Sequence, residues 1–214
     1  MNCYLNLLKK HALLLLILPV LINGCNSQND EPEGNTENKI NLIEYCKTHE
    51  CRRDLKFRLR TPDDNYFDFK STLSVPVVQE AIDKADPGGK KINYLVTVFP
   101  GETIHIAFDP GAEGPENLRS VPTADSSLNI LTFKLTQEEN IADGCGMKLY
   151  VHNSSKYFIK YWLFLYKIEE KKPDKVPSCP LRPESGSYET WEYPVFQFSM
   201  GKFQWADESD LDCK

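Results

Sequence analysis

The sequence predicts a mainly β protein folded as an antiparallel β-sandwich, with an immunoglobulin-like or cupredoxin-like outline. Three observations support this fold. Apolar and polar residues alternate with a period of two in several segments, turn residues separate these segments at short intervals, and one further run is apolar on both faces. Such alternation is typical of strands with one buried face, and about eight strands suffice for two stacked sheets.

The strands are expected in order along residues 40–214. In segment 55–60, Leu, Phe and Leu alternate with Lys, Arg and Arg. The run 92–99 is apolar on both faces, as a central strand requires, and Pro100-Gly101 then predicts a hairpin turn. Further strands are expected at 67–69, 103–108, 131–135, 147–151, 157–168 and 196–205, with a β-bulge at Gly201.

One segment favours a helix instead. Five apolar residues between Val77 and Ala85 form a stripe with i, i+4, i+8 spacing, Pro76 precedes it, and Pro87-Gly88-Gly89 ends it. We therefore expect one short helix near 76–86, and a further helical turn within 40–47. The Pro/Gly/Ser-rich segments 110–127 and 169–194 are expected to be long loops, where binding function usually lies.

The N-terminal segment has the layout of a secretory signal. Two lysines precede an apolar run of residues 12–22, and a small residue, Gly24, stands directly before Cys25. The stretch Leu21-Ile22-Asn23-Gly24-Cys25 resembles the lipobox of bacterial lipoprotein precursors. This resemblance implies removal of residues 1–24 and attachment of a diacylglycerol to Cys25. Asn26 after the cysteine resembles an outer-membrane signal, because an Asp at this position would imply retention in the inner membrane. The alternative is an ordinary signal peptide.

After Cys25 the amino-acid composition becomes polar. Residues 26–39 contain no large apolar side chain, so 25–39 are expected to be a lipidated cysteine followed by a disordered tether. Residues 40–214 are long enough for one domain with a substantial core. The apolar run before Cys25 is shorter than the roughly 20 residues of a spanning helix, which leaves the lipid as the expected membrane attachment.

The net charge of −6 limits the possible partners. Binding to nucleic acid requires a basic face, so no nucleic-acid partner is expected. Apart from the covalent lipid at Cys25, we expect no cofactor. The expected location is the cell envelope, lipid-anchored in the outer membrane.

Seven cysteines fit an exported protein, because disulfides form in oxidising compartments. We expect a local Cys46–Cys51 disulfide and a Cys179–Cys213 disulfide that closes the C-terminal segment. Cys145 is then unpaired, although the sequence also permits it to replace any of these four.

Two groups of residues have the chemistry of metal ligands. Cys46, His49 and Cys51 offer two thiolates and an imidazole, and His105, His152, Cys145 and Met147 offer the ligand types of a blue-copper site. In an oxidising compartment the first pair of cysteines favours a disulfide. Met147 precedes His152, which does not fit the ligand order of cupredoxins, so we predict no metal site.

No set of catalytic residues is predicted either. The sequence contains no Gly-x-Ser-x-Gly motif, and the mature chain offers three histidines as possible bases. A mechanism based on paired carboxylates stays open, because acidic residues are frequent throughout the chain.

Aromatic residues mark the expected binding surfaces. In strand 157–168, one face carries Trp162, Phe164 and Tyr166, and the opposite face is also apolar. One of the two faces fills the core, and the other meets a second layer of a doubly buried central strand, a loop or a partner. Tyr188, Trp191 and Tyr193 form either a binding lip or a lid over the core. The basic side chains of Lys56, Arg58 and Arg60 share the outer face of one strand, which suits edge protection or docking of an anionic partner.

Taken together, the sequence predicts a membrane-anchored exported lipoprotein. It would act as a non-catalytic binding or adaptor module in the cell envelope, with an envelope protein or polymer as its partner. The alternatives are a periplasmic metal-binding or redox protein and a hydrolase of envelope polymers.

Overall fold

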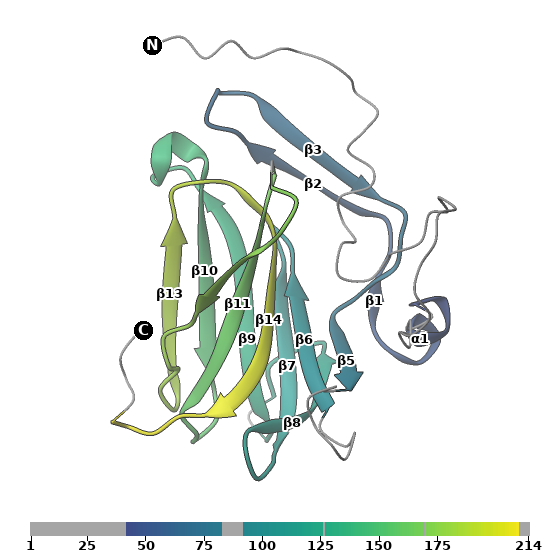
Figure 1. Ribbon diagram of the computed structural model, residues 1–214, viewed down its shortest axis with the longest axis vertical. Helices are drawn as coiled ribbons and strands as arrows, with labels where there is room; N and C mark the ends of the chain where they lie inside the picture. The colour runs from purple at the N-terminus through teal and green to yellow at the C-terminus, as the bar shows by residue number, and fades with distance from the viewer. Residues whose placement is uncertain (1–41, 83–91, 126, 169, 210–214) are drawn as a thin grey trace, which may run out of the picture. The chain divides into compact units, whose positions relative to one another are not determined.

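The computed structural model describes residues 42–82, 92–125, 127–168 and 170–209. The chain divides into two units, Met1–Ile40 and Asn41–Lys214, and every described residue belongs to the second. The described residues form two five-stranded antiparallel sheets, two shorter two-stranded sheets and one α-helix (Figure 1). The prediction of a mainly β, antiparallel two-sheet fold is therefore confirmed, and its finer outline stays a prediction.

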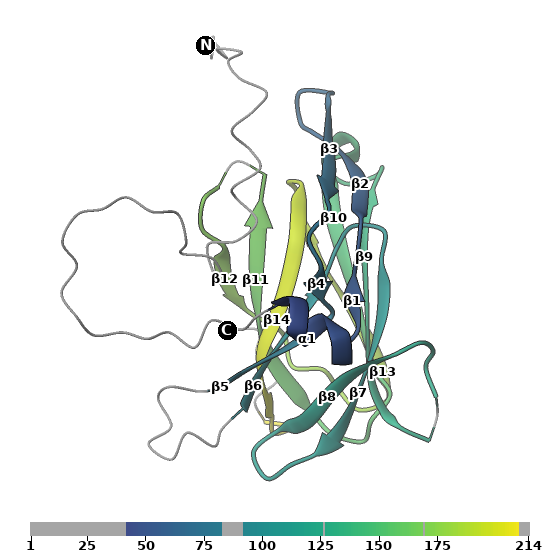
Figure 2. The same ribbon diagram turned by 90° about the vertical axis from the view of Figure 1, so that its right-hand side faces the viewer.

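The two large sheets stand face to face (Figure 2). Sheet I has the strand order β12-β11-β14-β6-β5, and sheet II has the order β13-β10-β9-β7-β8. The strands of sheet I are β5 (Val78–Ile82), β6 (Ile92–Val98), β11 (Ile159–Lys167), β12 (Asp174–Pro177) and β14 (Val195–Trp205). Those of sheet II are β7 (Thr103–Pro110), β8 (Pro115–Val121), β9 (Asn129–Glu138), β10 (Gly146–Asn153) and β13 (Ser185–Trp191).

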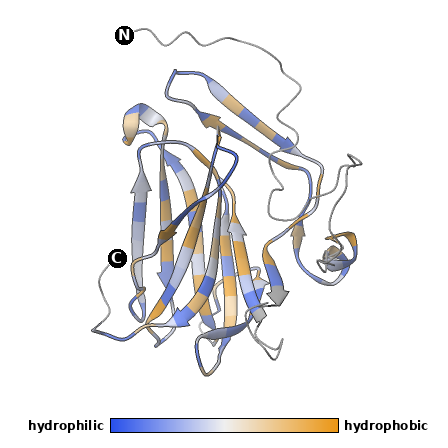
Figure 3. Cartoon of the chain, viewed as in Figure 1, coloured by the Kyte–Doolittle hydropathy of each residue, from blue (hydrophilic) through white to orange (hydrophobic). Residues whose placement is uncertain are grey.

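One hydrophobic core lies between the sheets. Alternate side chains of each central strand point into this core. Figure 3 shows the corresponding alternation of hydrophobic and hydrophilic residues along these strands. Phe133 of sheet II and Tyr161 of sheet I meet edge-on across this core, with ring centroids 6.0 Å apart. Burying each large apolar side chain contributes about 1.5–3 kcal/mol, so this contact layer holds the sheets together.

Smaller elements close one side of the sandwich. The hairpin of β2 (Leu55–Arg60) and β3 (Tyr66–Ser71) packs Leu59 and Phe69 against the core, and Phe69 stacks on Phe57 at 4.7 Å. The α-helix α1 (Leu42–Thr48) matches the helical turn expected within 40–47. It leads into β1 (Cys51–Arg52), which pairs with β4 (Val75–Pro76).

The helix expected near 76–86 is wrong for its described part. Residues 78–82 form β5, the edge strand of sheet I, and Ala85 lies outside the described residues. Two valines and an isoleucine in this stretch favour strand geometry. The chain bends at Val77, whose N–H donates to the Glu50 carbonyl and whose carbonyl accepts from the Thr97 N–H. Because of this bend, the consecutive residues Val77 and Val78 are both buried. Two adjacent buried residues are also expected on one face of a helix, so the sequence pattern resembles that of a helix.

The long loops expected at 110–127 and 169–194 are also partly wrong. The first contains β8, and the second contains β12 and β13. All three strands lie at sheet edges, where little of their surface is buried. Such strands need few apolar residues, so their sequences resemble loops.

The β-bulge expected at Gly201 is present. Trp162 pairs with Gly201 but Lys160 pairs with Gln204, so β14 contains one extra residue. Lys202, the residue after Gly201, adopts the positive φ of 53° that such an irregularity accommodates.

Candidate interaction surfaces

The outer face of β11 carries a row of aromatic side chains, which we call the aromatic face. The side chains of Trp162 and Phe164 point outward and are partly exposed, whereas Tyr166, near the end of the strand, is partly buried and packs against the core with its ring 6.2 Å from that of Phe196. The alternate residues Tyr161, Leu163 and Leu165 are buried in the core. The strand is therefore covered on one side and partly open on the other.

Polar contacts hold the aromatic face in place. Lys175 of β12 places its ammonium 3.9 Å from the Trp162 ring centroid, and Tyr166 forms a hydrogen bond with the buried Ser199. Burial raises the pKa of Tyr166, so its hydroxyl stays neutral. Ser199 is joined in turn to Thr97 on β6 at 3.1 Å. These contacts restrict the side-chain rotation of Trp162 and Tyr166 in the absence of a partner.

Gly201 leaves a gap in this face. It lies opposite Trp162 on β14, and a β-carbon added there would come within 3.5 Å of Leu95 and 3.6 Å of Phe164. The side chains of Leu95 and Phe164 therefore approach each other over the glycine, which continues the apolar surface from β11 to β6.

The three aromatic residues expected near the C-terminal segment have different positions. Trp191 and Tyr193 are partly buried and pack against the core, Trp191 with its ring 4.7 Å from Phe198. Tyr193 lies beneath the ammonium of Lys167 at 4.6 Å. These two residues cover the core, whereas Tyr188 on β13 is 67% exposed.

The basic cluster expected on segment 55–60 lies on the outer face of the β2–β3 hairpin. Arg58 forms an ion pair with Asp68 at 2.6 Å, and Arg60 pairs with Asp64 at 2.7 Å. Lys56 stands opposite Lys70 in the strand register. Since nearby carboxylates neutralise both arginines, the docking of an anionic partner on Lys56, Arg58 and Arg60 stays a prediction with reduced electrostatic support.

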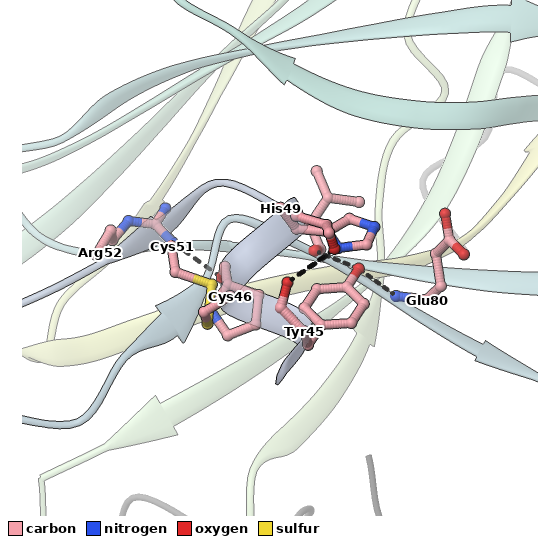
Figure 4. The surroundings of a disulfide bond; sticks show 9 residues. Tyr45, Cys46, His49, Cys51, Arg52 and Glu80 are labelled. Atoms are coloured by element: carbon pink, nitrogen blue, oxygen red, sulfur yellow. Dashed lines mark hydrogen bonds between the residues drawn. A yellow bond between two sulfur atoms is a disulfide. The ribbon is translucent and has the colours of Figure 1, made fainter. Parts of the chain in front are cut away.

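The predicted Cys46–Cys51 disulfide is present and connects α1 to β1 (Figure 4). The Tyr45 hydroxyl accepts from the Glu80 N–H at 3.2 Å and donates to the Val78 carbonyl at 3.0 Å. Val78 and Glu80 belong to the edge strand β5, so Tyr45 occupies backbone groups that would otherwise be open to another strand.

The same region disfavours the metal site considered for Cys46, His49 and Cys51. Both sulfur atoms are bonded to each other, and the His49 ring stacks on Tyr45 at 3.9 Å with its Nδ1 2.9 Å from Thr48 Oγ1. The described part of the chain contains no group of three or more His, Cys, Asp or Glu placed to hold a metal ion.

The blue-copper ligand types do not converge either. On β10, Met147 is fully buried in the core, whereas His152 has the opposite strand parity and lies on the outer face. His105 also points outward from β7, where its Nδ1 and Thr132 Oγ1 form a hydrogen bond of 2.9 Å. A single metal ion cannot contact side chains on both faces of a sheet.

The remaining cysteines have two different states. Cys145 is a free, buried thiol, as the predicted pairing leaves it. Cys179 is disulfide-bonded. Its predicted partner Cys213 lies outside the described residues, as does Cys25, so the Cys179–Cys213 pairing and the lipidation stay predictions.

A partly buried carboxyl group lies beside the core. Glu189 on β13 pairs with Leu149, so it faces inward, and it accepts a hydrogen bond from the Cys179 N–H. Burial raises the pKa of the Glu189 carboxyl, which this hydrogen bond partly offsets. Burial raises the pKa of Tyr161, and the charge of Glu189 adds to this shift; the buried Tyr161 hydroxyl has no hydrogen-bond partner among the described residues.

We therefore expect Glu189→Gln to stabilise the protein at neutral pH. A raised carboxyl pKa means that ionisation disfavours the folded state, so the gain is largest above that pKa. It disappears as the pH falls below about 4, where the carboxyl is protonated in both states. Thermal unfolding of both proteins between pH 4 and 8 measures this difference. Glu192→Gln, at an exposed site, is the control, and an equal gain at every pH would contradict the assignment.

Fold and surfaces together define the class of protein: an antiparallel two-sheet domain with aromatic side chains on its outer faces. No helix among the described residues is long and apolar enough to cross a membrane. Comparison with protein-family models, curated proteins and solved structures finds no match to this chain.

Proposed function

We propose that this chain is an exported lipoprotein, anchored to the outer membrane through Cys25, that acts as a non-catalytic binding module of the cell envelope. Its binding surface for a partner protein is the aromatic face. The lipobox-like sequence before Cys25 supports the anchor, and the arrangement of Trp162, Phe164 and Tyr166 supports the binding role.

The observation that carries the proposal is the restrained, partly exposed row of rings on β11. Aromatic side chains are enriched at the energetic centres of protein interfaces. Binding costs less when such side chains are already ordered. Here Lys175 holds Trp162, and Ser199 holds Tyr166.

Cross-linking in intact cells of the native host tests this role. We expect the wild-type protein to form a discrete cross-linked product, and the double variant Trp162→Ala, Phe164→Ala to lose about nine-tenths of it, because hot-spot truncations each cost more than about 1 kcal/mol. Tyr66→Ala and Leu73→Ala are the control, since both residues are exposed and lie outside sheet I.

The unfolding temperature of each variant shows whether the fold is retained. An unchanged cross-linked product in the folded double variant would remove the aromatic face from the proposal. A product lost equally in the control variants would have the same consequence.

A further inference from the structure

The outer face of sheet II brings together tyrosine, histidine, lysine and threonine side chains from separate strands, and we call it the tyrosine–histidine face. The register places two rows of residues across four strands. One row is Tyr188, Tyr150, Lys134 and Thr103, and the other is Gly186, His152, Thr132 and His105. With strands about 4.8 Å apart, each row extends about 14 Å.

Two tyrosine rings lie on this face. Tyr188 is 67% exposed, and the ammonium of Lys148 lies 4.8 Å from its ring centroid. Tyr150 leans over β13, because a β-carbon added at Gly186 would come within 2.6 Å of the Tyr150 hydroxyl and 2.9 Å of its ring. Because Gly186 has no β-carbon, the Tyr150 ring can pack directly against the backbone of β13.

The charges on this face differ from those of the whole chain. The protein has a net charge of −6, yet the two rows contain Lys134 and no carboxylate, and Lys148 lies beside them. Glu138, at one end of β9, accepts a hydrogen bond from Thr136 at 2.7 Å. Arg119, at the β8 edge, is paired with Asp109 at 3.3 Å. The centre of the face is therefore locally positive.

Hydrogen-bonding groups lie between the tyrosines and the lysines. His105 is oriented by its bond to Thr132, and His152 flanks Thr132 on the other side. Imidazole, hydroxyl and ammonium groups can donate to hydroxyl and carboxylate oxygens of a ligand. A sheet face of this width accommodates a chain molecule that lies flat across the strands.

We propose that the tyrosine–histidine face binds an anionic polysaccharide. The apolar faces of sugar rings pack on Tyr150 and Tyr188, because the negative face of an aromatic ring attracts polarised C–H groups. Lys134 and Lys148 bind the acidic groups, and the histidine–threonine row binds the sugar hydroxyls. Charge complementarity and exposed rings together select this ligand, and the site is separate from the aromatic face.

Titration of the full chain with oligomers of polygalacturonate and of chondroitin sulfate tests the proposal. We expect binding of at least one of them, weakened by salt because exposed charges contribute. Methyl-esterified galacturonate oligomers, which keep the rings but lose the charge, are expected to bind more weakly. Polyglutamate and single-stranded DNA, which keep the charge without the same rings, are expected to bind more weakly still.

Matched variants locate the site. Tyr188→Ala is expected to weaken binding about tenfold and Lys134→Gln about threefold, the latter with reduced salt dependence. Tyr66→Ala and Lys172→Gln are the controls, since Tyr66 is 61% exposed on the β2–β3 hairpin and Lys172 is exposed outside both sheets.

Absence of binding to both anionic polysaccharides would overturn the proposal. Equal binding of polyglutamate or DNA would also overturn it, by showing attraction to charge alone. Equal losses in Tyr66→Ala or Lys172→Gln would place the site elsewhere. None of these results depends on the aromatic face, so the outcome is independent of the cross-linking experiment.

Discussion

Arg52→Met is expected to lower the free energy of unfolding by about 3–5 kcal/mol, because it leaves a carboxylate without its buried partner. The side chain of Arg52 is only 10% exposed and that of Glu102 24%, with Nε and Oε1 2.6 Å apart. Burial lowers the pKa of Arg52, and the charge of Glu102 opposes this shift. Chemical denaturation of both proteins measures the loss.

The effect is large because Arg52 connects elements that are distant in sequence. Its guanidinium donates to the carbonyl oxygens of Pro76 at 3.1 Å and of Thr97, while the second Glu102 oxygen accepts from the Phe99 N–H at 2.9 Å. Thr97 belongs to sheet I, and Glu102 precedes the first strand of sheet II. The Arg52 side chain thus connects β1, β4, β6 and the turn between the sheets. The hairpin expected at Pro100-Gly101 is therefore wrong, because this turn carries the chain from one sheet to the other.

Two further variants distinguish the contribution of the ion pair to stability from the contribution of side-chain packing. The double variant Arg52→Met, Glu102→Leu is expected to regain part of the loss, because neither charge is then buried alone. Arg58→Met removes an arginine whose ion pair with Asp68 is about two-thirds exposed, and it is expected to change the denaturation midpoint little. Equal destabilisation by Arg52→Met and Arg58→Met would contradict this account.

Central strands could be predicted because the apolar side chains within each strand indicate that the strand is buried. On β10, Met147, Leu149 and Val151 alternate with polar or amphipathic residues, and this pattern specifies which face is buried, whatever the neighbouring strands are. The Cys46–Cys51 disulfide was predictable for a related reason, since its two cysteines are close in sequence. In both cases the information is local.

Edge strands and the bend at Val77 could not be predicted in the same way. The edge strand β13 has the sequence SGSYETW, and its only strongly apolar inward residue is Trp191. Val77 and Val78 are both buried because the chain bends between β4 and β5, which depends on partners in β6. The local periodicity of the sequence does not indicate which distant segments a strand will contact.

The tyrosine–histidine face illustrates this limit for a binding surface. Residues 148, 150 and 152 alternate outward along β10, and this pattern was visible in the sequence. Their neighbours Lys134, Thr132 and Tyr188 come from other strands, and the register that brings them together depends on hairpin geometry. Sequence alone therefore identified Tyr188 as a candidate without its surroundings.

Cys25→Ala is expected to move the protein that has lost its signal from the membrane to the soluble fraction almost completely. Each buried methylene of an acyl chain contributes about 0.8 kcal/mol, and two or more chains give stable anchoring where one gives only reversible binding. The net charge of −6 offers no electrostatic attraction to anionic lipid that would replace the chains. Fractionation of native-host cells, followed by intact-mass measurement of the membrane-bound protein, tests this expectation.

The anchor variant must be distinguished from a secretion defect. Cys145→Ala alters a buried thiol that is distant in sequence from the signal, and it is expected to leave the protein in the membrane fraction, whereas Cys25→Ala yields soluble exported protein or uncut precursor. A wild-type protein whose mass shows no lipid, or a Cys25→Ala variant that stays bound to the membrane at its mature length, would contradict the anchor. The aromatic face and the tyrosine–histidine face would then serve a protein that diffuses freely, and their partners would have to be sought without a membrane constraint.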